Sequence, residues 1–126
     1  MEIVIDFPEG KRVDAHLGSM TVKTDQNGVD PTPFTLFLVS IGTCAGIYVL
    51  GFCQQRNLPT RGVQLLQRVH RNPVSKMIEK IDLEIQVPPE FPERYYSALV
   101  NSANLCAVKK HLENPPEFNV YTQVVS

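Results

Sequence analysis

The sequence predicts an α+β protein in which antiparallel sheets surround a long, buried central helix. Two observations predict this class. Segments with alternating apolar and polar side chains, typical of strands, occur both before and after one long apolar segment. Strands that come in groups between helices indicate antiparallel pairing, not a doubly wound parallel sheet. The 126 residues fit one domain, 1–126, because no repeat or linker divides them.

The first 25 residues predict three short strands joined by tight turns. Apolar and polar residues alternate from Glu2 to Phe7, from Arg12 to Leu17 and from Met20 to Thr24. Glycine-containing turns at residues 8–11 and at Gly18 separate the three segments. Three strands connected in this way form an antiparallel meander.

The uncharged segment from Pro31 to Gln55 predicts the central helix. Thr32 can cap its first amides, and the following proline suits the first helical position. We expect the helix to end near Arg56. It is apolar enough to span a bilayer, but the rest of the chain has the pattern of a complete amphipathic fold, which favours a buried helix and no membrane. Gly42 and Gly46 predict close approach of another backbone, from a second helix or a second subunit.

The second half of the chain predicts two more strands, two helices and a final strand. The strands are expected to lead from Val63 towards Arg71 and from Ile81 to Val87. A helix opens at Pro92, and Asn104 is expected to cap a second, shorter helix. Alternation between Phe118 and Val124 predicts the last strand.

The composition excludes some functions. The chain is 43% hydrophobic and 20% charged, with a formal net charge of -1. No basic cluster exists that could bind nucleic acid. The N-terminal residues have the pattern of a strand and not of a signal peptide, so we expect a cytoplasmic protein.

Three cysteines, Cys44, Cys53 and Cys106, are the candidates for chemistry. An odd number at wide spacing is not a disulfide framework. The sequence has no CxxC pair and no closely spaced histidines, so we expect no metal and no cofactor. Free thiols in a reducing compartment either pack in the core or react. Cys53 lies on the opposite helix face from Cys44 and is expected to pack.

The two remaining cysteines differ in their expected surroundings. Cys44 lies well inside the long helix, so the dipole at the end of that helix cannot activate it, and a nearby cation or hydrogen-bond donor would have to hold its thiolate. Cys106 is better placed, because it lies in the first turn after Asn104, where unpaired amides favour an anion. Lys109 and Lys110 follow within one turn.

Two segments resemble the OsmC/Ohr family (osmotically induced protein C and organic hydroperoxide resistance proteins). Pro33-Phe34-Thr35-Leu36-Phe37, followed by Ser40-Ile41-Gly42-Thr43-Cys44, resembles the start of the family's central helix. In that family a cysteine lies eight residues after the first residue of a Leu-Leu or Leu-Phe pair, which is the spacing from Leu36 to Cys44. Asn104-Leu105-Cys106-Ala107-Val108 resembles the second cysteine motif. The order of elements matches over nearly the whole chain.

The resemblance implies a thiol-dependent peroxidase that reduces organic hydroperoxides. Cys44 would attack the peroxide as a thiolate and become a sulfenic acid, and Cys106 would condense with it to a disulfide that a cellular dithiol reduces. Arg12 is the candidate for the family arginine that stabilises the thiolate. Phe34 and Thr35 occupy the positions where family peroxidases usually carry a glutamate. The resemblance also implies an intertwined homodimer.

Two other hypotheses remain open. The chain could carry or transfer sulfur or acyl groups on Cys44. Alternatively, it could be a binding module whose apolar cleft takes a small ligand while both cysteines only pack. In each case we expect an apolar pocket near Cys44 and Cys106.

Overall fold

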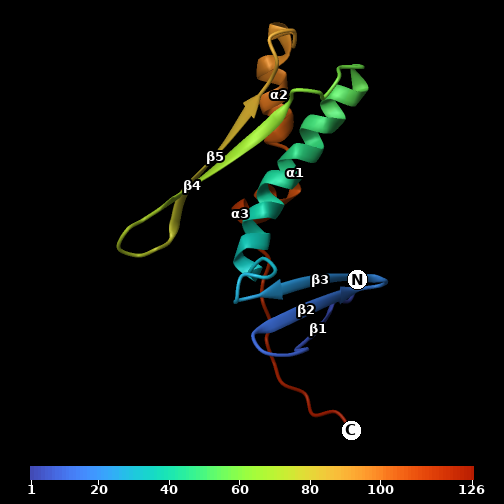
Figure 1. Ribbon diagram of the computed structural model, residues 1–126, viewed down its shortest axis with the longest axis vertical. Helices are drawn as coiled ribbons and strands as arrows, with labels where there is room; N and C mark the ends of the chain where they lie inside the picture. The colour runs from blue at the N-terminus through green and yellow to red at the C-terminus, as the bar shows by residue number, and fades with distance from the viewer. The chain divides into compact units, whose positions relative to one another are not determined.

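A three-stranded antiparallel sheet forms the N-terminal part of the protein. The computed structural model describes residues 1–126, and the chain divides into two units, Met1–Ser40 and Ile41–Ser126, which are described in turn. In the first unit β1, β2 and β3 pair in chain order, as Figure 1 shows, so the predicted meander is confirmed. Their bounds are Val4–Asp6, Arg12–Leu17 and Met20–Asp25.

The loop after β3 leads into a capped helix. Asp25 is 2% exposed, and its carboxylate accepts hydrogen bonds from the backbone amides of Asn27 at 3.1 Å and Val29 at 3.4 Å. Helix α1, Pro33–Gln55, follows. The amide of Thr35 donates to Thr32 Oγ1 at 3.1 Å, which confirms the predicted cap.

Asparagine ends α1. Asn57 has a φ of 54°, in the left-handed region. Its amide donates to the carbonyl of Gln54 at 3.3 Å, and the amide of Leu58 donates to the carbonyl of Cys53 at 2.9 Å. This pair of bonds is a Schellman motif, which satisfies carbonyls that the helix itself leaves unpaired.

One face of α1 is buried within the chain. Residues about one turn apart form the buried stripe: Ile41, Ala45, Val49, Phe52 and Cys53. Elsewhere on the helix Ile47 is 64% exposed and Leu50 is 37% exposed. By length and composition α1 could cross a membrane, and less than half of its most apolar part is buried within this chain. The helix therefore carries more apolar surface than one chain covers.

A long hairpin and two short helices complete the second unit. Strands β4, Gln64–Arg71, and β5, Ile78–Gln86, pair antiparallel and lie beside α1 in Figure 1. After them come a single 3-10 turn, Glu93–Tyr95, and helix α2, Tyr96–Ala103. The core joins α1 to the segment around α2 through Val49, Phe52, Cys53, Phe91 and Leu99, with side chains of the hairpin packed against them.

Helix α3, Ala107–Glu113, begins at a different residue from the one predicted. Asn104 closes α2, with its backbone amide bonded to the carbonyls of Val100 and Ser102. Cys106 is the residue that precedes the first turn of α3. The prediction that Asn104 caps the short helix is wrong, because α3 begins only after Cys106 and the side-chain oxygen of Asn104 accepts a hydrogen bond from Lys109 instead.

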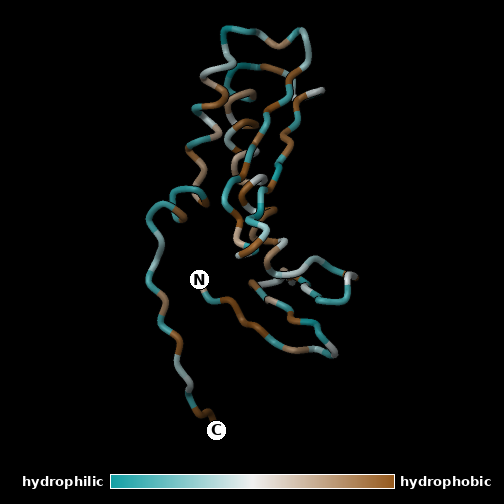
Figure 2. Tube along the Cα trace, turned by 90° about the vertical axis from the view of Figure 1, so that its left-hand side faces the viewer, coloured by the Kyte–Doolittle hydropathy of each residue, from teal (hydrophilic) through white to brown (hydrophobic).

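The predicted strand from Phe118 to Val124 is also absent. Residues 114–126 form no regular structure, and Figure 2 shows hydrophobic and hydrophilic stretches following one another along them. Val120 and Val124 are each 93% exposed. The alternation has the pattern of a strand, but a strand needs a neighbour for its hydrogen bonds, and the chain provides none at this segment.

The helix glycines have different neighbours from those predicted. A Cβ added at Gly42 would collide with the side-chain amide oxygen of Gln67, so a side chain and not a backbone approaches there. A Cβ at Gly46 would meet nothing within 4 Å in this chain. Contacts within the chain therefore explain why glycine is needed at position 42, but they give no such reason at position 46.

These neighbours predict different effects on stability for two alanine substitutions. Gly46→Ala should raise the free energy of unfolding by up to about 1 kcal/mol, because alanine is the better helix former. Gly42→Ala should gain less or lose stability, since Gln67 must move away from the new methyl group. Urea unfolding of the two variants beside the parent protein measures the difference. Equal stabilisation by both substitutions would contradict the contact with Gln67.

Candidate functional site

The fold brings Cys44 and Cys106 together. Cys44 lies in α1 and is partly exposed, whereas Cys106 precedes α3 and is 2% exposed. Both are free thiols, and the Cys106 thiol donates a hydrogen bond to the Cys44 sulfur. Residues 62 positions apart in sequence therefore form one pair of sulfur atoms.

Backbone amides at the start of α3 make Cys44 the more acidic thiol of the pair. A hydrogen bond from the amide of Val108 is the largest cause that lowers the pKa of Cys44, followed by the Cys106 thiol, with the amide of Ala107 contributing less. These amides are available because the first amides of a helix have no partner within it. From the sequence we expected that a Cys44 thiolate would need a cation or a hydrogen-bond donor nearby, and the first amides of α3 are such donors.

The pKa of Cys106 is shifted in the opposite direction, upward. Burial is the largest cause that raises its pKa, and its hydrogen bond to Cys44 raises it further, against a smaller lowering by the amides of Lys109 and Val108. The predicted effect of the helix start on Cys106 is present, since the amides of Lys109 and Val108 lower its pKa, but burial outweighs it and the pKa of Cys106 is raised. The sequence did not reveal that amides of the same turn also lower the pKa of Cys44. Of the two thiols, Cys44 is therefore the one that loses its proton more readily.

Arg12 is paired with carboxylates of its own unit. Its guanidinium lies 2.5 Å from the carboxylate of Asp30 and 3.9 Å from that of Asp25. The hydrogen bond to Asp30 is the main cause that raises the pKa of Arg12. These contacts secure the loop between β3 and α1 against β2. The role of Arg12 beside the Cys44 thiolate stays a prediction.

Cys53 lies in the core. It is fully buried beside Phe52 and Val49, and burial raises the pKa of its thiol. These are the properties of a packing cysteine, as the sequence indicated. The described residues contain no group of three or more histidines, cysteines or acidic residues that could hold a metal ion.

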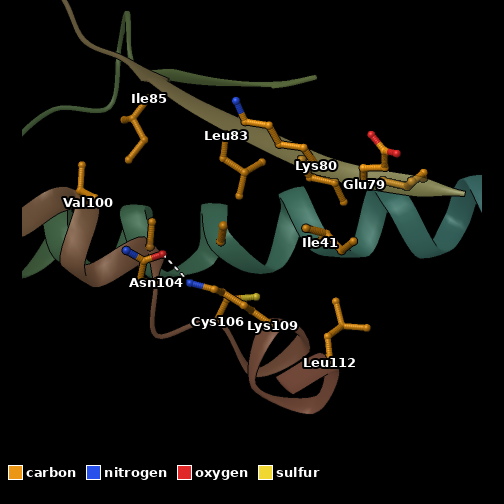
Figure 3. A pocket seen from close by; sticks show the side chains of 14 residues that line it. Ile41, Glu79, Lys80, Leu83, Ile85, Val100, Asn104, Cys106, Lys109 and Leu112 are labelled. Carbon is orange, nitrogen blue, oxygen red and sulfur yellow. Dashed lines mark hydrogen bonds between the residues drawn. The ribbon is translucent and has the colours of Figure 1, made fainter. Parts of the chain in front are cut away.

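A cavity of about 510 Å³ lies beside the pair of cysteines, between α1, β5, α2 and α3. Figure 3 shows Leu83 and Ile85 of β5 on one side of it and Ile41 of α1 on the other. Cys106 lines this cavity, and Cys44 does not. The predicted apolar pocket thus exists, but it opens onto the second cysteine. Its full lining is Ile41, Ala45, Ile78, Glu79, Lys80, Ile81, Leu83, Ile85, Val100, Ala103, Asn104, Cys106, Lys109 and Leu112.

Polar groups in the cavity lining come from Asn104 and Lys109 in particular. The ammonium of Lys109 donates a hydrogen bond to Asn104 Oδ1 at 2.9 Å (Figure 3). The side chain of Lys80 also belongs to the lining, but its ammonium pairs with Asp82 at 3.6 Å. Sequence reasoning named Lys109 only as a charge near Cys106. Its contact with Asn104 could not be read from the spacing.

By its fold and its site the protein is an α+β thiol protein, in which antiparallel sheets accompany a long helix and two thiols share a hydrogen bond. The profile of the OsmC-like protein family matches residues 24–121. The chain therefore belongs to the OsmC-like family. A search of curated proteins found no match.

Solved structures share the fold at low sequence identity. A protein of Psychrobacter arcticus 273-4, described as an osmotic stress induced and detoxification response protein, superimposes with a TM-score of 0.70 at 17% identity, over 86% of this chain and 85% of that one. A hypothetical protein of Aquifex aeolicus VF5 gives 0.66 at 18% identity, over 90% and 87%. The organic hydroperoxide resistance protein OhrB of Bacillus subtilis gives 0.52 at 12%, over 91% and 93%.

Family membership also bears on α1. OsmC-like proteins are soluble, and the core helix of a soluble protein passes the same test of length and hydropathy as a membrane span. The apolar character of α1 is therefore weak evidence for a membrane.

The amide of Val108 can be removed to test its effect on Cys44. Val108→Pro eliminates the N–H in the first turn of α3, where proline is tolerated, and should shift the pKa of Cys44 upward. Val108→Ala keeps the amide and is the matched control. The measurement is the pH dependence of Cys44 alkylation by iodoacetamide, with peptide mapping. The profile of the proline variant should move to higher pH, and an unchanged profile would exclude this amide as the cause.

Proposed function

We propose that the protein is a thiol-dependent peroxidase that reduces organic hydroperoxides in the cytoplasm. The observation that carries the proposal is the asymmetric thiol pair, in which Cys44 is the more acidic and Cys106 donates a hydrogen bond to it. A peroxidase of this type needs one thiol that is ionised near neutral pH and a second thiol within bonding reach. Membership of the OsmC-like family and the fold shared with an organic hydroperoxide resistance protein support the same chemistry.

The chemistry has two steps at the pair. The Cys44 thiolate attacks the terminal oxygen of the hydroperoxide, the O–O bond breaks, and the alkoxide takes up a proton and leaves as an alcohol. Cys44 is then a sulfenic acid. The sulfur of Cys106 attacks the sulfur of Cys44, its proton and the hydroxyl group leave as water, and a Cys44–Cys106 disulfide forms. The partial exposure of Cys44 gives the peroxide access to it.

Surrounding groups would assist the first step. The amides of Val108 and Ala107 are hydrogen-bond donors to the Cys44 sulfur, and they can hold the thiolate without a neighbouring cation. We assign Arg12 the further role of a cation for this site, in keeping with the family resemblance. For that role Arg12 would have to give up at least one of its ion pairs, with Asp25 or with Asp30, in favour of the thiolate.

One equivalent of cumene hydroperoxide tests the cycle on fully reduced protein. Intact mass should fall by two hydrogens, and peptide mapping should link Cys44 to Cys106. Cys44→Ser should abolish the reaction while the protein stays folded, because the substitution is nearly isosteric. Cys106→Ser should stop at the sulfenic acid. Unchanged mass with Cys44 still open to alkylation would mean that the fold serves sulfur transfer or ligand binding instead.

We also propose that the working form is a homodimer. The chain leaves large apolar side chains exposed on several elements, including Ile47 at 64%, Leu105 at 50% and Phe118 at 86%. A monomer seldom exposes this much apolar surface, which is typical of an interface. The strand-like segment 118–124 also lacks a partner strand in its own chain, and a second copy could supply one.

Sedimentation equilibrium tests the dimer. The chain of 14.2 kDa should sediment as two copies. Ile47→Glu should shift the equilibrium towards the single chain, since it places a charge on the exposed face of α1. Gln54→Glu, at another exposed position of the same helix, is the control and should leave the dimer intact. A monomeric parent protein would overturn this proposal.

A further inference from the structure

Cys106 lies in the short connection between α2 and α3, residues 104–106. Asn104, at the start of this connection, is fixed to α2, because its backbone amide is bonded to two carbonyls of that helix. The core holds α2 in turn through Leu99, which is 2% exposed. The first end of the connection therefore has a firm support.

The other end has much less support. Helix α3 contains no buried residue, and within it only Val108 is partly buried. Leu112, its largest apolar side chain, is 51% exposed. Apolar packing therefore holds α3 weakly, although the start of this helix has to place Cys106 and two amides beside Cys44.

A hydrogen bond bridges the connection. The ammonium of Lys109 donates to Asn104 Oδ1 at 2.9 Å, and the two residues stand on either side of Cys106 in the chain. All three side chains line the same cavity, and Figure 3 shows the bond that joins the outer two. A charged donor makes a stronger hydrogen bond than a neutral one, and the carboxylate of Glu113, at 4.0 Å, competes only weakly for it. The bond therefore ties the weakly packed α3 to the firmly held end of α2.

We infer that Asn104 and Lys109 are positioning residues for the resolving step, and that their hydrogen bond holds the sulfur of Cys106 within reach of Cys44. The inference rests on the proposed peroxidase function and deepens it. In this step Cys106 loses its proton and attacks the sulfur of the Cys44 sulfenic acid, the S–O bond breaks, and the hydroxyl group leaves with the proton as water. A disulfide tolerates only a narrow range of geometries, and so a small shift of the connection slows the attack.

Lys110 provides the comparison within the same helix. It carries the same charge one residue further along, but it lies outside the cavity lining. Successive residues of a helix point about 100° apart, so only one of the two lysines can face Asn104. A general effect of positive charge on α3 would involve both lysines, whereas the positioning role belongs to Lys109 alone.

A reagent that needs no peroxide tests the closing step. The Cys44 thiolate attacks one equivalent of dithiobis(nitrobenzoate), forms a mixed disulfide and releases one thionitrobenzoate anion. Cys106 then loses its proton, attacks the sulfur of Cys44 and releases the second anion, which leaves a Cys44–Cys106 disulfide. The second release is intramolecular, so its rate does not depend on the concentration of the reagent. Both releases are followed by absorbance, at a pH where alkylation of Cys44 is complete in every variant.

Asn104→Ala and Lys109→Met should each slow the second release about fivefold, which corresponds to the loss of one hydrogen bond to a charged donor at a partly exposed site. The variant with both substitutions should be no slower than either alone, because the same bond is lost. Lys109→Arg keeps a cationic donor and should restore the parent rate, and Lys110→Met is the matched control that should have no effect. Additive effects of the two substitutions would overturn the inference, as would an unchanged second release or a Lys109→Arg variant as slow as Lys109→Met.

Excess cumene hydroperoxide shows the consequence for the proposed cycle. Slow closure leaves the Cys44 sulfenic acid open to a second peroxide, which transfers one oxygen to the sulfur and leaves as the alcohol. Lys109→Met should therefore accumulate about fivefold more sulfinic acid on Cys44 than the parent protein at the same early time, as measured by intact mass. Equal amounts in two proteins that both react would overturn the inference. A second thionitrobenzoate release that depends on the hydrogen bond, in a protein that ignores the peroxide, would contradict the proposed peroxidase alone.

Discussion

The site depends on the meeting of the α3 N-terminus with the sulfur of Cys44. Cys44 lies in the middle of α1, where the amides of its own helix are already bonded. The unpaired amides of Ala107 and Val108 come from α3, and together with the Cys106 thiol they lower the pKa of Cys44. Because α3 supplies these amides and Cys106 directly precedes it, the position of α3 beside α1 determines both the lowered pKa of Cys44 and the place of the second thiol. Packing of α2 against α1 secures that position, in part through the hydrogen bond from Ser102 to the Tyr48 carbonyl at 3.1 Å.

The same packing creates a difference between the two thiols that their chemistry can use. Cys106 lies in the wall of the cavity and has its pKa raised by burial, while Cys44 lies outside that wall and has its pKa lowered.

A second constraint is the surface of the chain. The helix α1 buries one stripe and leaves Ile47 and Leu50 open, and residues 118–124 alternate like a strand without a partner. Such surfaces are unfavourable in water, so they account for the proposed homodimer.

The sequence alone determined the α+β class, the meander, the capped α1 and the cysteine motifs of the family, because periodicity, caps and short motifs are local properties. It failed where the outcome depends on contacts between distant residues. It placed the favourable amides at Cys106 alone, and only the tertiary structure shows that amides of the same turn also reach Cys44 and that burial outweighs their effect on Cys106. It expected a strand at 118–124, but strand formation requires a neighbour that local alternation cannot supply. Which sulfur lies in the wall of the cavity was likewise decided by the packing of α1, β5 and α3, since spacing along a chain does not specify which surfaces meet.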